Sequence, residues 1–319
     1  MLTFVIRRIL ILIPMLILIS FMIFGGLELT PGDAVSQMLS PEIAGTISAE
    51  ELDALREKFG LNASFLERYW IWLSNVMQGN FGYSLASGVA ITDVFFDRLP
   101  ATLELATLAL FFSSIFGIAL GTMAALRRGS LADGSLTVAG MLGVSIPEFF
   151  FALVSLLIFA LNLNWLPVGG RLLPGYESFW DRAPHLVMPV MVMSLMMTAG
   201  VMRYARSAML DSMSKEFMRT ARSKGLPEWR VNFLHGFRTA LTPVIVLIGF
   251  RLPTLIGGTV IIEQVFQWPG VGNEFVQAVR GQDYPLVMMI ALFSVSAMLV
   301  ASLIIDVLTA LIDPRVRLG

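Results

Sequence analysis

Four long runs of this chain contain no charged side chain: Ile9–Leu27, Leu105–Leu126, Leu186–Met202 and Tyr284–Ile305. A helix needs about 20 mostly apolar residues to cross the hydrocarbon core of a bilayer, and each run approaches or exceeds that length. Two further apolar stretches, 136–161 and 239–262, carry one charge each, Glu148 and Arg251. We therefore predict an all-α membrane protein with six transmembrane helices.

The composition supports this class and excludes several others. Hydrophobic residues make up 56% of the 319 residues and charged residues only 14%, which is too few to cover a water-soluble surface. The net charge of -1 leaves no basic excess for a nucleic-acid backbone. With no cysteine and two histidines, the chain cannot form thiolate or multi-histidine metal sites.

The distribution of lysine and arginine predicts the orientation. Six spans place both termini on one side, and the segments 1–8, 127–135, 203–238 and 313–319 on that side hold 14 of the 22 basic residues. Because cytoplasmic loops are enriched in Lys and Arg, both termini and the loop 203–238 are predicted to be cytoplasmic. The resulting parts are a first transmembrane helix (1–29), an extracytoplasmic helical segment (30–97), a five-helix transmembrane domain (98–312) and a cytoplasmic tail (313–319).

The segment 30–97 contains two capping boxes, Ser48–Glu51 and Ser64–Glu67. In this motif the serine accepts a hydrogen bond from a free amide of the first turn, so we predict short helices over 49–59 and 65–77. Tyr69, Trp70 and Trp72 of the second helix suit a membrane interface, or they pack this segment onto itself.

The loop 203–238 contains a short predicted helix within 214–226, with Ser214 as N-cap and Gly225 just beyond its end. Phe217, Thr220 and Ala221 share one face of it. Such a helix docks into a groove of another protein or meets anionic lipid through its basic residues.

Several motifs decide between these alternatives, because together they resemble the permeases of binding-protein-dependent ABC importers. The cytoplasmic signature loop of that family is similar to Arg219-Thr-Ala-Arg-Ser-Lys-Gly225-Leu226, although Arg219 and Thr220 stand where Glu and Ala are usual. The resemblance extends over nearly the whole chain and is nearest to the B-type permease of dipeptide, oligopeptide, nickel or glutathione importers. The other motifs are Leu29-Thr-Pro-Gly-Asp33, Gly79-Asn-Phe-Gly-Tyr-Ser84, Arg98-Leu-Pro-Ala-Thr-Leu-Glu-Leu-Ala106, Ala124-Ala-Leu-Arg-Arg-Gly129, Glu263-Gln-Val-Phe-Gln-Trp-Pro-Gly-Val-Gly272, Asp283-Tyr-Pro285 and Asp313-Pro-Arg315.

The resemblance implies a type I permease fold and a location in a bacterial or archaeal cytoplasmic membrane. It also implies that the protein moves dipeptides or oligopeptides by alternating access. It implies four partners: a homologous C-type permease, two ATPase subunits that hold ATP and Mg, and an extracytoplasmic substrate-binding protein. The sequence has no phosphate-binding loop of its own, so this chain is expected to have no cofactor and no enzymatic activity. The resemblance assigns contact with the ATPases to Phe217, Arg219, Thr220, Ala221, Gly225 and Leu226.

Ionisable residues at membrane depth are candidates for the solute path. Arg251 either lines the cavity and attracts a peptide carboxylate, or forms a structural pair with Glu148, Asp306 or the partner permease. Glu148 follows Pro147, where freed carbonyl groups can line a cavity. A carrier for nickel, glutathione or another small solute is an alternative function. A secondary transporter is another, but it would require an intramembrane proton relay and inverted repeats, which the sequence lacks.

Overall fold

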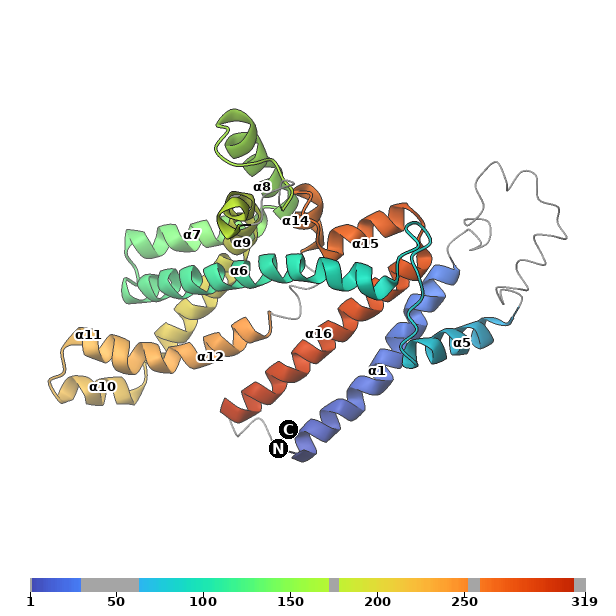
Figure 1. The fold of residues 1–319 in the computed structure, drawn as a ribbon. Coiled ribbons are helices and arrows are strands. Elements are labelled where there is room, and N and C mark those ends of the chain that lie inside the picture. Colours follow the sequence, from blue (N-terminus) through green and yellow to red (C-terminus); the bar gives the residue numbers. More distant parts are fainter. Residues whose placement is uncertain (1, 30–62, 172–177, 252–258, 313–319) are drawn as a thin grey trace. The chain divides into compact units, whose positions relative to one another are not determined.

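The computed structural model describes residues 2–29, 63–171, 178–251 and 259–312, and this part of the chain is helical, with no β-strand (Figure 1). Five of the described helices are long and apolar enough to cross a membrane, or six if one bent pair counts as a single span. The helices are α1 (Leu2–Glu28), α5 (Phe65–Met77), α6 (Ile91–Leu126), α7 (Leu131–Ser145), α8 (Glu148–Ser155), α9 (Phe179–Met213), α10 (Glu216–Ser223), α11 (Glu228–Arg230), α12 (Arg238–Gly249), α14 (Val260–Val265), α15 (Val271–Arg280) and α16 (Tyr284–Ile312), with π-helical segments η1 (Leu156–Asn162) and η2 (Val231–Phe237).

The chain divides into two compact units, Met1–Leu99 with Glu274–Leu299 and Pro100–Asn273 with Val300–Gly319. In the first unit α5 packs on α1 through aromatic side chains. Tyr69 is buried, lies 5.1 Å from the Phe21 ring centroid and shares a 2.8 Å hydrogen bond with the Ser20 hydroxyl. The Trp72 ring contacts the Phe24 ring in a tilted arrangement, with centroids 5.6 Å apart, whereas Trp70 is 61% exposed. Two of the three aromatic residues therefore pack within the unit, and Trp70 faces outward.

The predicted helix 65–77 is confirmed, and Ser64 is its N-cap, accepting a hydrogen bond from the Glu67 amide. The first capping box, Ser48–Glu51, and the helix predicted over 49–59 lie outside the described residues. So does the predicted cytoplasmic tail 313–319.

Asp283 joins two sequence motifs of the first unit. Its Oδ2 atom accepts hydrogen bonds from the Ser84 hydroxyl at 2.5 Å and the Ala86 amide at 3.2 Å. Its Oδ1 atom accepts from the Leu286 amide in the first turn of α16. Asp283 and Ser84 are both buried, so one carboxylate caps a long helix and fixes the loop that precedes α6.

In the second unit α9 is the central helix, contacting α7, α8, α12 and η2. Two glycines of α6 allow a close approach: a Cβ atom at Gly117 would meet the Val201 side chain, and one at Gly121 would overlap the Met202 carbonyl oxygen. Small residues at such positions let membrane helices pack backbone to backbone. The pair Arg206–Asp133 then joins α9 to the first turn of α7, at 2.7 and 2.8 Å.

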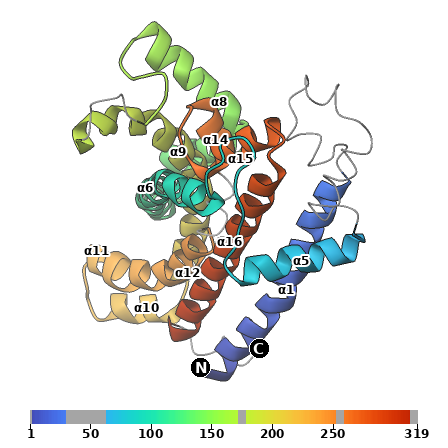
Figure 2. The ribbon, with the colours of Figure 1, turned by 45° about the vertical axis from the view of Figure 1, so that its right-hand side comes forward.

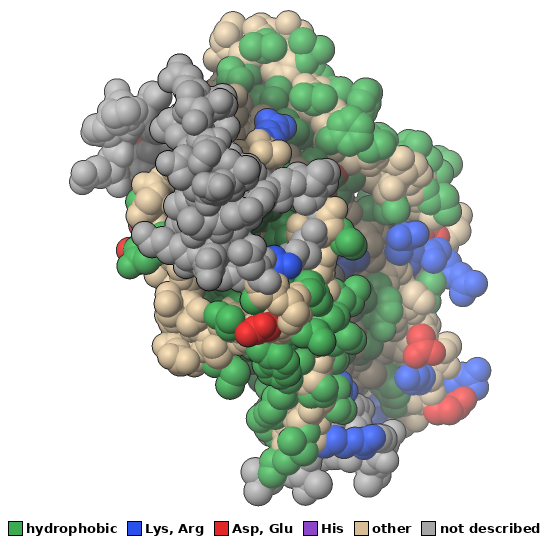
Figure 3. All heavy atoms as spheres, turned by 90° about the vertical axis from the view of Figure 1, so that its right-hand side faces the viewer, with side chains coloured by type: hydrophobic (Ala, Val, Ile, Leu, Met, Phe, Trp, Pro, Cys, Tyr) green, Lys and Arg blue, Asp and Glu red, His purple; other side chains and the backbone are tan. Residues whose placement is uncertain are grey.

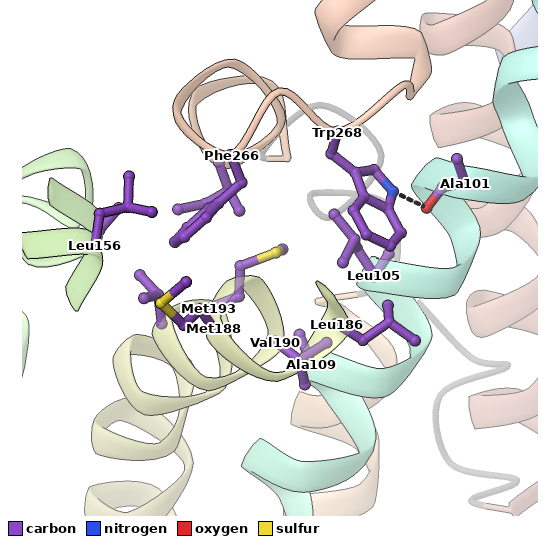
Figure 4. Packing of buried hydrophobic residues seen from close by; sticks show 14 of the residues in the cluster. Ala101, Leu105, Ala109, Leu156, Leu186, Met188, Val190, Met193, Phe266 and Trp268 are labelled. Atoms are coloured by element: carbon purple, nitrogen blue, oxygen red, sulfur yellow. Dashed lines mark hydrogen bonds between the residues drawn. The ribbon is translucent and has the colours of Figure 1, made fainter. Parts of the chain in front are cut away.

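The main hydrophobic core of this unit collects side chains from α6, α8, η1, α9 and the α14 region (Figure 4). Trp268 and Phe266 enter it from beyond α14 and are almost completely buried. The indole nitrogen of Trp268 donates a 2.9 Å hydrogen bond to the Ala101 carbonyl group, which satisfies the only polar atom of a side chain that is otherwise enclosed by Leu105, Leu186 and their neighbours.

The stretch 136–161, predicted as one span, is helical but broken in the structure. The structure breaks it into α7 and α8–η1, which meet at an angle of 99°. Ile146 has extended backbone angles (φ -84°, ψ 127°) and precedes Pro147, the N-cap of α8. A residue before proline is disfavoured in the helical region, so the sequence Ser-Ile-Pro ends one helix and starts another.

The stretch 239–262 also departs from the predicted single helix. α12 ends at Gly249, and the next described helix, α14, begins at Val260 and packs on α8. The apolar helix that reaches Gly249 begins much earlier, at Glu228, because α11, η2 and α12 form one continuous rod.

Much of the described surface is hydrophobic. Only 6% of the most apolar window of α1 and 22% of that of α16 is buried within the chain. Figure 3 shows one face on which apolar side chains dominate and charged side chains gather mainly toward an edge. A surface of this kind requires lipid or other membrane helices around it.

Candidate functional site

The short helix predicted within 214–226 is present as α10 and lies alongside the rod formed by α11, η2 and α12 (Figures 1 and 2). Gly225 has a left-handed backbone (φ +73°), which confirms its predicted position just after the helix. Ser214 is not the N-cap: it ends α9 and donates a 2.7 Å hydrogen bond to the Asp211 carbonyl group. The N-cap is Lys215, whose side chain caps no amide.

The faces of α10 differ from the predicted arrangement. Met218 and Ala221 are buried in a cluster with Val231, and Leu226 packs against it. Phe217 is 38% exposed and Thr220 is exposed. The predicted contact face of Phe217, Thr220 and Ala221 is therefore divided, because Ala221 belongs to the packing within the chain. Met218 was missed, although its spacing of three residues from Ala221 places the two on one side of a helix.

The charged side chains of α10 make exposed ion pairs. Arg219 contacts Glu216 at 3.0 Å, and Arg222 contacts Glu228 at 3.0 Å. Exposed pairs contribute only about 0–1 kcal/mol. Their role in holding α10 is therefore small compared with that of Met218, and both arginines can exchange these partners for others.

One hydrogen bond and two methionine side chains hold η2 against α9 and α10. The buried Ser212 hydroxyl of α9 donates to the Gly236 carbonyl group of η2 at 2.8 Å. A Cβ atom at Gly236 would lie 3.1 Å from Met218 and 3.2 Å from Met209. The π-helical turn thus brings its glycine against α9 and α10 together.

Arg251 lies two residues beyond the end of α12 and extends its guanidinium group across α9. The group contacts Gly200 so closely that a Cβ atom there would overlap it. Arg203 is located three residues further along α9 and is exposed. The absence of a side chain at Gly200 therefore leaves the space that the guanidinium group of Arg251 occupies.

Glu148 is half-buried and is the first residue of α8, directly after the 99° bend. Its carboxylate is at a helix N-terminus, where the helix dipole favours negative charge. In the described part of the chain Glu148 has no ion-pair partner, so the predicted pair with Arg251 is not found.

The sequence analysis did not single out the carboxylate of Glu263, which is completely inaccessible to solvent. It accepts hydrogen bonds from the Thr102 hydroxyl of α6 at 2.7 Å and from the Asn273 amide at 2.9 Å. The Thr102 oxygen in turn accepts from the Val271 amide at 2.8 Å. Gly270 and Gly272 lie against the carboxylate, where any side chain would overlap it.

A third carboxylate, Glu104 of α6, is shared by two arginines. Arg171 donates to it at 2.8 Å, and Arg182 of α9 lies 3.7 Å from its other oxygen. All three side chains are about three-quarters buried or more. No group of three or more His, Cys, Asp or Glu residues in the described segments could hold a metal ion.

These helices define a polytopic α-helical membrane protein. Two family models match the chain: "Binding-protein-dependent transport system inner membrane component" over residues 117–318, and the N-terminal model of the same kind of membrane component over residues 1–106. The chain belongs to this family of binding-protein-dependent transport system inner membrane components.

Relatives of known name are similar over nearly their full length. The oligopeptide transport system permease protein AppB of Bacillus subtilis (strain 168) is 38% identical over 99% of this chain and 100% of the relative. The di/tripeptide transport system permease protein DppB of Pseudomonas aeruginosa (strain UCBPP-PA14) and the glutathione transport system permease protein GsiC of Escherichia coli (strain K12) are each 34% identical over 99% of both chains.

The fold is also similar to a solved structure titled "Crystal structure of an amino acid ABC transporter with histidines". The TM-score is 0.50 with 17% sequence identity, covering 68% of this chain and 94% of that one. At this identity the similarity concerns the fold alone.

Proposed function

We propose that this chain is the permease subunit of an ATP-driven importer that carries dipeptides or oligopeptides across the cytoplasmic membrane. The observation that carries the proposal is full-length similarity to permeases named for oligopeptides, di/tripeptides and glutathione. Glutathione is itself a small peptide, so the three named solutes share one chemical class. Nickel or another small solute is the alternative.

In this proposal the energy for transport comes from the ATPase subunits. The exposed side of α10, with Phe217, Arg219 and Thr220, contacts an ATPase subunit, while Met218 and Ala221 hold α10 to the rest of the chain. Gly225 and Leu226 terminate the helix and turn the chain into α11. The full importer then comprises two ATPase subunits with ATP and Mg, a C-type permease and an extracytoplasmic binding protein.

In this proposal the contacts that attach α10 to the chain transmit the motion that produces alternating access. When the ATPases close, they displace α10, and the contacts of Met218 and Ser212 transfer this displacement to η2 and α9. The closed ATPases must bind one conformation of the permeases better than the other for the equilibrium to shift. α9 also carries the Gly200 contact of Arg251, so the same motion moves the candidate path residue.

The experiment that tests this function is uptake in proteoliposomes that contain the complex purified through a tag on this chain, together with its binding protein. Peptide uptake that requires ATP and continues after the proton gradient is collapsed supports the importer. Uptake that stops with the gradient while ATP is present supports a secondary transporter instead.

We further propose that Arg251 attracts the C-terminal carboxylate of the transported peptide, and this role can be tested in the same vesicles. Arg251→Met should reduce uptake of a peptide with a free C-terminus at least tenfold more than uptake of the same peptide amidated there. Arg251→Lys should restore part of the difference, and Arg203→Met is the matched control. Equal losses for both peptides, with a lower thermal midpoint, would make Arg251 a structural residue.

A further inference from the structure

A second site lies within the second unit, between α6 and the rod of η2 and α12. It is a groove of about 640 Å³. One wall is formed by Ile115, Ile118 and Ala119 of α6, and the other by Phe233, Phe237 and Leu241. Of its ten lining residues only Thr122 and Arg127 are polar, so the groove suits an apolar ligand and not a hydrated peptide.

The length of the groove matches one leaflet of a bilayer. Its lining along α6 and the residue that follows it extends from Ile115 to Arg127, which at about 1.5 Å per residue is about 18 Å. The hydrocarbon core of a bilayer is about 30 Å thick, so one leaflet is about 15 Å. A transmembrane helix of another subunit would need a groove through both leaflets, whereas an acyl chain needs only one.

The charge at one end of the groove identifies the headgroup. Arg127 follows the last residue of α6 and is exposed, and Arg128 comes next. In the orientation of the proposed function, on which this step rests, that end faces the cytoplasmic surface. A guanidinium group there attracts anionic lipid headgroups, at about 1 kcal/mol per basic residue, which corresponds to about fivefold in affinity.

We propose that this groove binds one acyl chain of an anionic phospholipid of the cytoplasmic leaflet, with Arg127 at the phosphate. The lipid fills the space between α6 and the η2–α12 rod, directly beside the Ser212–Gly236 hydrogen bond that holds the rod to α9. Such a lipid would fill the space that the described side chains leave empty.

The test measures the phosphatidylglycerol and phosphatidylethanolamine that remain with the detergent-purified complex after extensive washing. We expect Ala119→Trp, which fills the middle of the groove, to remove the retained lipid of both kinds. Arg127→Gln should lower retained phosphatidylglycerol about fivefold and leave phosphatidylethanolamine unchanged. Matched controls are Val138→Trp, an exposed site on α7 outside the groove, and Arg128→Gln, which should both retain lipid as the wild type does.

Three results would overturn the proposal. Equal lipid retention in Ala119→Trp and Val138→Trp would mean that the groove holds none. Loss of the partner permease from Ala119→Trp on size exclusion would assign the groove to a helix of that subunit. A disulfide between cysteines placed at Ala119 and in α1 of this cysteine-free chain would assign it to α1. Lipid retention is measured without transport, so its failure leaves the importer function untouched.

Discussion

Glu263 shows how one buried carboxylate can organise residues that are distant in sequence. Its hydrogen bond to Thr102 joins positions 161 residues apart, and its second oxygen holds the amide of Asn273. The glycines of the motif that follows Glu263 are needed because the carboxylate occupies the space of their missing side chains. The sequence presented these residues as a motif, but nothing in it indicated that Thr102 completes the site.

A Glu263→Gln substitution tests the site with almost no change in volume. One amide oxygen still accepts a hydrogen bond, but the NH₂ group faces a donor, either the Thr102 hydroxyl or the Asn273 amide. An unmatched buried polar group costs about 1–3 kcal/mol, so the thermal midpoint of the purified complex should fall by several degrees.

The matched control is Glu274→Gln, which removes the Arg98 pair at 3.2 Å, where the arginine is 42% exposed. Partly exposed pairs contribute about 0–1 kcal/mol, so its effect should be clearly smaller. Equal midpoints for the two variants would show that the Glu263 hydrogen bonds contribute no more than a surface pair.

At the scale of elements, apolar run length predicted where membrane helices occur but not how they bend. The runs within α1, α6, α9 and α16 are confirmed as long helices. Hydropathy did not reveal the breaks in the runs 136–161 and 239–262. Pro147 divides the first run, whereas the helix of the second ends at Gly249 and begins earlier, before a π-helical segment. Proline gave a readable signal, whereas the π-helical turn depends on tertiary contacts such as Ser212 with Gly236.

The division of α10 into a buried and an exposed side gives a prediction that separates folding from coupling. Met218→Ala leaves a cavity at a completely buried position, at a cost of about 2–5 kcal/mol, and should lower the thermal midpoint. Phe217→Ala should leave the midpoint within the range of surface changes, about 0.5 kcal/mol, while ATP hydrolysis no longer responds to the loaded binding protein. Both are measured on the reconstituted complex.

Phe149→Ala is the control, because Phe149 is an exposed aromatic residue of α8, outside the loop 203–238. If Phe217→Ala and Phe149→Ala hydrolyse ATP and transport peptide equally well, the exposed side of α10 does not contact the ATPases. Ala221→Glu is a poorer probe, since it would place a charge in the cluster with Val231 and disturb folding and coupling together.

For the whole molecule, the distribution of basic residues predicts an orientation that helix geometry alone does not contain. Five of the described helices are long and apolar enough to cross a membrane, or six if α7 and α8–η1 form one broken span, and the two counts would place the termini differently. With six crossings the N-terminus and α10 would lie on the same side, as the 14 basic residues of the predicted cytoplasmic segments predict.

Single cysteines can test the orientation without background, because the chain has none of its own. Ser64 and Ser214 are suitable sites, since both are exposed in the structure and neither lies within a long apolar helix. In intact cells a membrane-impermeant maleimide should label Ser64→Cys and leave Ser214→Cys unlabelled. In inverted vesicles the pattern should reverse, which controls for reactivity at Ser214. Because both side chains are accessible, only the side of the membrane decides the result, and labelling of Ser214→Cys in intact cells would place α10 outside, beyond the reach of any cytoplasmic ATPase.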